Sequence, residues 1–180
     1  MTHEKWFISD THFFHANILK FTGKDDKRIR EPFNTLEEMH ETLIENWNTH
    51  IAEEDYVYHL GDVTFRYDGV FNNLMSRLSG KKRLIVGNHD KLTNPALFKH
   101  FEKVELWKGF SDKEASIAFT ASHFPLPQYV LRNGKHNAHG HIHQNKSPEA
   151  HQLNLSVEAT NYMPVHIDQV AEYFKQETSA

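Results

Sequence analysis

Short apolar runs that stop abruptly at polar residues divide the first half of the chain. The runs cover residues 5–9, 55–60 and 83–86, and the candidate polar groups that follow them are Asp10, Asp62 and Asn88. Glycines at positions 61 and 87 mark the ends of the second and third runs. Each run therefore predicts a short buried strand, with chemistry gathered in the loop at its carboxyl end.

Two helices are expected between these strands. For the first, Asn34 is placed to cap the helix and Glu37 occupies the capping-box position. Its apolar positions recur at helical spacing along one face: Leu36, Met39, Leu43, Ile44 and Trp47. The second helix carries Val70, Leu74, Met75 and Leu78. This alternation predicts βα units that contribute to one sheet.

The second half of the chain is richer in strand-like segments. The candidates are residues 104–107, 116–121, 135–138 and 154–157, before a helix from about Asp168. We expect these strands to build a second sheet. No linker, repeat or low-complexity tract interrupts the sequence, so one domain over residues 1–180 is predicted.

The composition is that of a folded chain without a global attraction for polyanions. Hydrophobic residues make up 38%, aromatic residues 12% and charged residues 24%, unlike the profile of a disordered chain. The net charge of −4 disfavours extended nucleic acid and an anionic membrane as partners. Neither a signal peptide nor an apolar run of 18 residues is visible, so a cytoplasmic location without a membrane span is expected. The oligomeric state is left open.

Histidine is the unusual component, with 15 residues against no cysteine. A metal would therefore be held by imidazole, carboxylate or amide groups. By themselves, Asp10 and Asp62 are explained at least equally well as turn residues, and His123 is better explained as a partly buried histidine. The run from Gly87 to Asp90 is more specific, because an amide, an imidazole and a carboxylate follow one strand within four residues.

Two further histidines decide between these interpretations. His141 and His143 lie two apart, so they point the same way in an extended segment. A structural zinc site needs only four closed ligands, whereas the candidates here suffice for two ions that share a carboxylate. Two such ions, about 3.5–4 Å apart, can clamp both sides of a phosphoryl displacement. The candidate ligands are Asp10, His12, Asp62, Asn88, His123, His141 and His143.

In this order the blocks resemble those of the calcineurin-like metallophosphoesterases. The matching blocks are Asp10-x-His12, Gly61-Asp62, Gly87-Asn88-His89-Asp90, His123 and Gly140-His141-x-His143. The resemblance implies a four-layer α/β/β/α sandwich with two mixed sheets and a metal site at strand carboxyl ends. It also implies one ion held by Asp10, His12 and His143, a second by Asn88, His123 and His141, and Asp62 between them.

A finer resemblance concerns residues 10–18, 30–33 and 46–48, which are similar to a branch of small bacterial and phage phosphoesterases. Larger family members have an extra domain over the site that is missing from this sequence, so substrate specificity is left open. The resemblance makes His89 catalytic.

The expected mechanism is attack on phosphorus by a hydroxide that bridges the two ions. His89 is the candidate general acid, and Asp90 is expected to orient it. Manganese is the first choice of metal, with iron, zinc and nickel as alternatives. Asn88, His15 and Arg30 are candidates for binding substrate, although a surface position explains His15 and Arg30 equally well. Asn17 and Arg28 are further candidates, and for Arg28 the surface interpretation is preferred. His136 and His139 are interpreted as supporting or surface residues.

We therefore expect a phosphoesterase that hydrolyses a phosphomonoester or phosphodiester, either a nucleotide or another small phosphorylated molecule. One alternative is a nuclease that acts on short nucleic acid, which the absence of a basic, aromatic-interleaved tract disfavours. Another is a non-catalytic, metal-dependent binding or scaffold protein. Such a protein would be expected to have lost ligands, whereas none is missing here.

Overall fold

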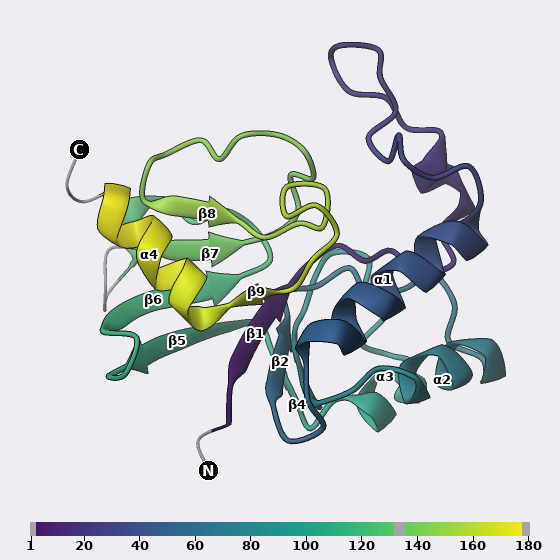
Figure 1. The fold of residues 1–180 in the computed structure, drawn as a ribbon, viewed down its shortest axis with the longest axis horizontal. Coiled ribbons are helices and arrows are strands. Elements are labelled where there is room, and N and C mark those ends of the chain that lie inside the picture. The colour runs from purple at the N-terminus through teal and green to yellow at the C-terminus, as the bar shows by residue number, and fades with distance from the viewer. Residues whose placement is uncertain (1–2, 132–135, 178–180) are drawn as a thin grey trace.

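The computed structural model describes residues 3–131 and 136–177, and its strands form two sheets (Figure 1). The first sheet has the order β4-β3-β2-β1-β9 and the second the order β5-β6-β7-β8. The first contains β1 (Lys5–Ile8), β2 (Tyr56–His59), β3 (Lys81–Ile85), β4 (Lys103–Glu105) and β9 (Val165–His166). The second contains β5 (Trp107–Asp112), β6 (Ile117–Ser122), β7 (Asn137–His139) and β8 (Gln152–Asn154).

Both sheets are mixed. Strands β1 to β4 run parallel, and β9 pairs antiparallel with β1. In the second sheet β5 is antiparallel to β6, while β6, β7 and β8 are parallel. The predicted α/β sandwich of two mixed sheets is therefore confirmed.

Three helices cover the outer face of the first sheet, and a fourth lies beside β9 and the second sheet (Figure 1). Helices α1 (Leu36–His50), α2 (Gly69–Ser76) and α3 (Pro95–His100) lie over the first sheet, whereas α4 (Ile167–Glu177) contacts β9, β1 and β8. Two short 3₁₀ turns cover Ala16–Leu19 and Gln128–Val130. In the described part of the chain, no helix is long and apolar enough to cross a membrane.

Alternation along the central strands divides the core in two. On β1, Ile8 packs with the α1–α3 cluster while Phe7 packs between the sheets, because successive side chains of a strand point to opposite faces. Val57 and Tyr58 divide in the same way on β2. Phe174 of α4 joins the second cluster, so this helix shares the core between the sheets.

The parallel strands bring their carboxyl ends to one edge. Ile8 at the end of β1 is in register with His59 at the end of β2, and His59 with Leu84 of β3. The two sheets meet at the same edge, where Ser9 forms a parallel bridge with Ser156. The loops after β1, β2 and β3 therefore emerge beside the loops of the second sheet.

The start of α1 differs by one residue from the prediction. Thr35, not Asn34, is the N-cap: its hydroxyl accepts a hydrogen bond from Glu38 N at 3.1 Å. The Glu38 side chain accepts in return from Thr35 N, so Glu38 takes the place predicted for Glu37. Both pairs fit the motif in the sequence. The predicted apolar face is confirmed.

The second helix is also shifted slightly. Leu74 and Met75 are buried as expected, but α2 ends at Ser76, before Leu78. Val70 is 47% exposed, and Phe71 takes the buried position at the start of the helix. Asp68 caps this helix by accepting hydrogen bonds from the first backbone amides.

The strands of the second half differ most from the predictions. The expected strand over residues 104–107 is two strands in different sheets, which meet at the exposed Leu106. The expected strand over 154–157 is displaced, because β8 ends at Asn154 and the following residues cross to the first sheet. For the expected strand over 135–138, Lys135 lies outside the described residues and β7 begins at Asn137. Helix α3 and strand β9 were not predicted.

Candidate metal centre

Five of the seven candidate ligands have a left-handed backbone. Their φ angles are 59° for Asp10, 48° for His12, 58° for Asp62, 72° for His141 and 50° for His143. Residues other than glycine adopt this region rarely and at an energetic cost, and such residues cluster at functional sites. The loops that carry the candidate ligands are therefore held in a conformation that local preference does not explain.

Two glycines allow these loops to pack against each other. A Cβ atom on Gly87 would lie 2.2 Å from Asp62 Oδ1, and one on Gly140 would lie 2.4 Å from Asp10 Oδ2. Both distances are far below van der Waals contact, so any side chain at either position would displace a candidate ligand.

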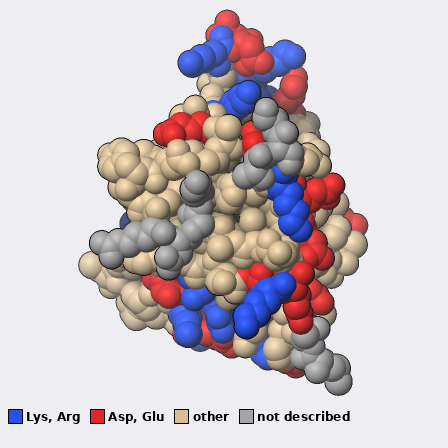
Figure 2. Space-filling model, turned by 90° about the vertical axis from the view of Figure 1, so that its left-hand side faces the viewer, with Lys and Arg blue, Asp and Glu red and all other residues tan. Residues whose placement is uncertain are grey.

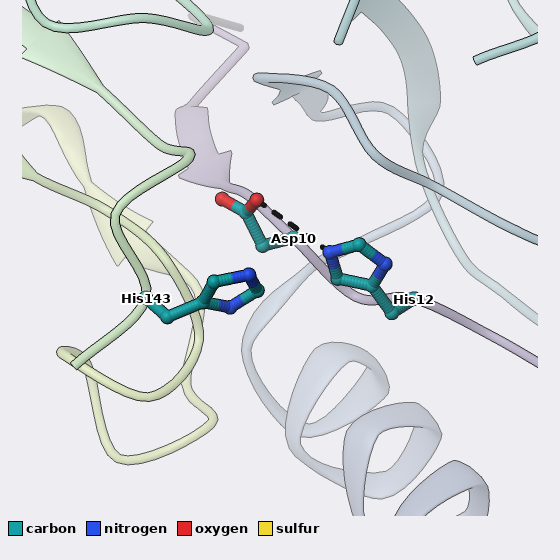
Figure 3. A group of neighbouring side chains, drawn as sticks. All are labelled: Asp10, His12 and His143. Carbon is teal, nitrogen blue, oxygen red and sulfur yellow. Dashed lines mark ion pairs between the residues drawn. The ribbon is translucent and has the colours of Figure 1, made fainter. Parts of the chain in front are cut away.

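Asp10, His12 and His143 converge on one point (Figure 3). They offer ligand atoms that all lie within 4.8 Å of one another, with Asp10 and His12 from the loop after β1 and His143 from the loop after β7. His12 Nε2 is 3.8 Å from Asp10 Oδ1. Asp10 Oδ2 is already engaged, because it accepts hydrogen bonds from His141 N and Ser156 Oγ. The remaining oxygen, Oδ1, faces the group.

A second group is formed by Asp10, Asp62 and His123. Asp62 Oδ2 lies 3.6 Å from His12 Nε2 and 3.5 Å from His123 Nε2, so one oxygen is nearly equidistant from a nitrogen of each group. This is the position that a bridging carboxylate requires. Asp62 Oδ1 accepts a hydrogen bond from His89 N, which orients the carboxylate.

Asn88 and His141 flank the second group. The His123 ring lies with Nε2 2.9 Å from Asn88 Oδ1 and Nδ1 2.8 Å from Leu60 O. The Leu60 carbonyl can only accept, so Nδ1 donates to it. In the neutral ring, Nε2 and Asn88 Oδ1 are then two facing acceptors, which a shared cation would satisfy. The His141 ring centroid is 5.0 Å from that of His123. The structure thus brings all seven candidate ligands to one edge of the sandwich.

Unpartnered polar atoms at this edge fit a divalent cation. Among the described residues, Asp10 Oδ1 and both ring nitrogens of His12 are buried without a hydrogen-bond partner. Buried polar atoms are rarely left unsatisfied, since each costs free energy. A set of carboxylate oxygens, an amide oxygen and imidazole nitrogens is also the donor set that first-row divalent metals accept.

The protonation states of His12 and Asp10 also favour metal binding. Burial lowers the pKa of His12 to about 4, so its ring is neutral at pH 7 and can coordinate. Burial opposes ionisation of Asp10, but the neighbouring His12, His123 and His143 outweigh it and hold the pKa of this carboxyl below its usual range. Burial raises the pKa of Asp62, which a nearby cation would lower again.

His89 and Asp90 do not form the pair expected from the sequence. His89 is exposed beside the centre, with its ring centroid 5.7 Å from that of His12. Asp90 accepts hydrogen bonds from the backbone amides of Asp62, Val63 and Gly87. Its carboxylate therefore joins two ligand-bearing loops, and the expectation that it orients the His89 ring is corrected.

The predicted substrate-binding residues have different surroundings. His15 lies near the first group and stacks on Phe65, with ring centroids 3.8 Å apart. Asn88 is exposed next to His123. Arg30 is fully buried and donates to the carbonyl oxygens of Asp10 and Thr11, so the expectation that it contacts substrate is corrected.

Three further residues singled out in the sequence have surface or supporting positions. Asn17 is exposed on the first 3₁₀ turn. Arg28 donates to the carbonyl oxygens of Glu31 and Phe33 and fits the surface interpretation. His139 is buried, with its ring nitrogens 2.8 Å from Gly140 O and 2.9 Å from Ser147 Oγ.

Comparison with known proteins agrees with this geometry. A family model for calcineurin-like phosphoesterases matches residues 5–176. The chain belongs to the calcineurin-like phosphoesterase family. An uncharacterised protein of Methanocaldococcus jannaschii is 33% identical over 180 residues, which cover 95% of this chain and 91% of that protein. The gene 66 protein of Mycobacterium phage L5 is 30% identical over 169 residues, and the match covers 77% of this chain and 76% of that protein.

A solved structure supports the fold of this calcineurin-like phosphoesterase. A protein of unknown function from Aquifex aeolicus superposes with a TM-score of 0.72 at 24% identity, covering 95% of this chain and 99% of that one. Family membership makes the present protein a metal-dependent phosphoesterase, and its Asp/His groups are suited to divalent ions.

Three polar residues of this phosphoesterase that touch the centre were missed in the sequence. Asn154 donates to His143 O, Ser156 donates to Asp10 Oδ2, and Glu158 lies 3.0 Å from His143. They alternate with the buried apolar residues Leu155 and Val157, although Glu158 already lies in a turn. This alternation of polar and apolar residues was the signal in the sequence that could have identified them.

Proposed function

We propose that this phosphoesterase uses a dinuclear centre to hydrolyse a small phosphorylated molecule. The observation that carries the proposal is the position of Asp62 Oδ2, 3.6 Å from His12 Nε2 and 3.5 Å from His123 Nε2. A carboxylate oxygen between two imidazole nitrogens is what two adjacent ions would share. When bound, two divalent ions supply Lewis acidity that polarises the phosphoryl group and activates water.

The chain's own residues divide the remaining tasks. Asp10, His12 and His143 would hold the first ion, and Asn88, His123 and His141 the second. The exposed His89 ring lies beside the centre, where it can protonate the leaving oxygen. His89 N donates to Asp62, so the acid and the bridging carboxylate are positioned by the same loop. Manganese is our first choice of metal, because mixed oxygen and imidazole donors suit it.

Aromatic rings at the mouth of the site support a substrate with an apolar or planar group, such as a nucleotide. Phe65 is 36% exposed with its ring centroid 5.1 Å from that of His89, and Phe124 is 46% exposed and 4.4 Å from His141. Each ring lies beside one half of the centre. His15 and the amide of Asn88 would donate hydrogen bonds to phosphate oxygens.

The net charge of −4 offers less support for a nuclease that binds a long strand. On the face shown in Figure 2, Lys and Arg side chains of the described residues lie beside Asp and Glu side chains. The Lys and Arg side chains of the described residues form no continuous stripe on this face, whereas a phosphate backbone requires one.

The test is turnover of a generic aryl phosphodiester with added manganese. The wild-type protein should hydrolyse the ester and lose activity on treatment with a chelator. Asp62→Asn should weaken binding of both ions and abolish most turnover, because the amide lacks the charge that two cations share. Asp68→Asn is the matched control, since this exposed N-cap of α2 lies outside the site and asparagine also caps helices.

Two results would contradict the proposal. One is turnover that persists unchanged after complete removal of metal. The other is retention of two tightly bound ions per chain in Asp62→Asn, which would exclude the shared carboxylate.

A further inference from the structure

A buried ion pair lies directly behind the first half of the metal centre. Arg30 Nε donates to Glu158 Oε1 at 2.8 Å, and the same oxygen lies 3.0 Å from His143 Nδ1. The two charged side chains are 0% and 1% exposed. Burying such a pair costs desolvation energy that its mutual attraction does not always recover. The pair's other contacts therefore indicate what it contributes.

Arg30 is directed at the loop after β1. Its Nη1 donates to Thr11 O at 2.9 Å, and its Nη2 donates to Asp10 O. These two carbonyls belong to the segment in which Asp10 and His12 both have positive φ angles. The guanidinium thus holds the backbone in the strained conformation that directs both side chains into the site.

Glu158 is directed at the third ligand of the same group. An ionised carboxylate can only accept hydrogen bonds, so His143 Nδ1 carries the proton and donates it to Glu158. The lone pair of the neutral ring is then on Nε2. Figure 3 shows the His143 ring beside Asp10, opposite His12. A carboxylate behind a ligating imidazole fixes its tautomer and orientation and raises its basicity.

We propose that Arg30 and Glu158 are positioning residues that together set the affinity of the first metal subsite. Arg30 holds the loop that presents Asp10 and His12, and Glu158 holds His143 with Nε2 free. The pair connects residues 128 positions apart, so it also fixes the two ligand-bearing loops relative to each other. This inference rests on the proposed metal centre, and it predicts that the two subsites respond differently to loss of the carboxylate.

The first experiment needs no variant. Long-range ¹H–¹⁵N correlation spectra of the metal-free wild-type protein at alkaline pH report which nitrogen of each neutral histidine is protonated. We expect His143 to be protonated at Nδ1. Protonation at Nε2, with Nδ1 free, would overturn the proposal whatever the behaviour of the variants.

The second experiment is a titration with manganese(II) alone, followed by calorimetry and electron paramagnetic resonance. Glu158→Gln keeps the shape of the side chain and removes its charge. The first subsite should lose about 10- to 100-fold in affinity, and the second should change little. The control is Glu149→Gln, which alters another Glu–His pair in which Glu149 Oε2 lies 3.4 Å from His151 Nδ1. It should bind both ions as the wild type does.

The outcomes separate this inference from the proposed function. Wild-type affinity at both subsites of Glu158→Gln would overturn the inference and leave the metal centre intact. An equal loss at both subsites, in proportion to a lower unfolding midpoint of the metal-free variant, would also overturn it, because the pair would then be merely structural. A wild-type protein that binds no manganese would overturn both proposals.

Discussion

Individual side chains at the candidate metal centre differ in how firmly their contacts hold them in place. Asp62, Asn88 and His123 are fixed by contacts to one another and to the backbone. Among the described residues, His89 is held by a hydrogen bond from its backbone amide, and its exposed ring is bordered by Phe65 and His12. A ring that is free to approach substrate suits a general acid and not a metal ligand.

His89→Ala should therefore lower kcat by about 10²- to 10⁴-fold while sparing metal content. The loss should be larger for an alkyl ester than for a nitrophenyl ester, because the poorer leaving group depends more on protonation. Steady-state kinetics with both esters and metal analysis of the purified variant measure the two effects. His50→Ala, at an exposed position at the end of α1, is the control. Equal losses for both esters would exclude His89 as the acid.

Among the elements, α1 shows how a buried histidine couples the fold to pH. His40 is 8% exposed on this helix, and its Nε2 accepts a hydrogen bond from Phe14 N at 3.0 Å. Burial lowers the pKa of His40 to about 4 from its ordinary value of 6.5. The neighbouring charges only adjust this shift: Glu37 and Glu41 oppose it, and Arg30 and Arg77 add to it.

The stability that His40 contributes should be complete above pH 6.5 and should decline as the pH falls toward 4. In this interval the unfolded chain binds the proton and the folded protein does not, so acid favours unfolding. His40→Gln retains an acceptor for Phe14 N without titrating. Denaturant unfolding across the interval should give a flatter pH dependence for the variant, by at most about 1.4 kcal/mol per pH unit. Parallel curves would show that His40 has the same pKa in the folded and unfolded protein, which would contradict the prediction.

In the whole molecule, the candidate ligands come from both sheets. Asp10, Asp62 and Asn88 follow strands of the first sheet, and His123, His141 and His143 follow strands of the second. Bound ions would therefore tie the two sheets together at their common edge. The apolar core between the sheets, with Phe7 packed on Phe110 and Phe119, holds them together without metal.

Manganese should consequently raise the unfolding free energy of the whole protein. An ion that binds only the folded state stabilises it by about 2.7 kcal/mol at a free concentration one hundred times its Kd. Thermal unfolding with and without manganese, and again after chelation, measures the gain and its reversal. Sodium chloride at matched ionic strength controls for screening, and Asp62→Asn should gain less. An unchanged midpoint in the presence of bound manganese would contradict a site shared between the sheets.

The sequence by itself determined where the candidate ligands lie. Asp10, Asp62, Asn88 and His123 follow apolar runs that form strands, whereas His141 and His143 follow the polar strand β7. The order of blocks indicated the family and the sandwich fold. This succeeded because strand formation and the polar loop after it are local patterns in the sequence. The exact cap of α1 was less certain, since two overlapping pairs, Asn34 with Glu37 and Thr35 with Glu38, satisfy the same motif.

Only the tertiary structure decided what surrounds those ligands. Arg30 and Glu158 are 128 positions apart, and no local pattern relates them. Asp90 follows His89 in sequence, yet its carboxylate turns to the backbone of another loop. The path of residues 154–157 likewise depends on the first sheet, with which Ser156 pairs. Burial and long-range hydrogen bonds set these positions, and both arise only when the two sheets pack together.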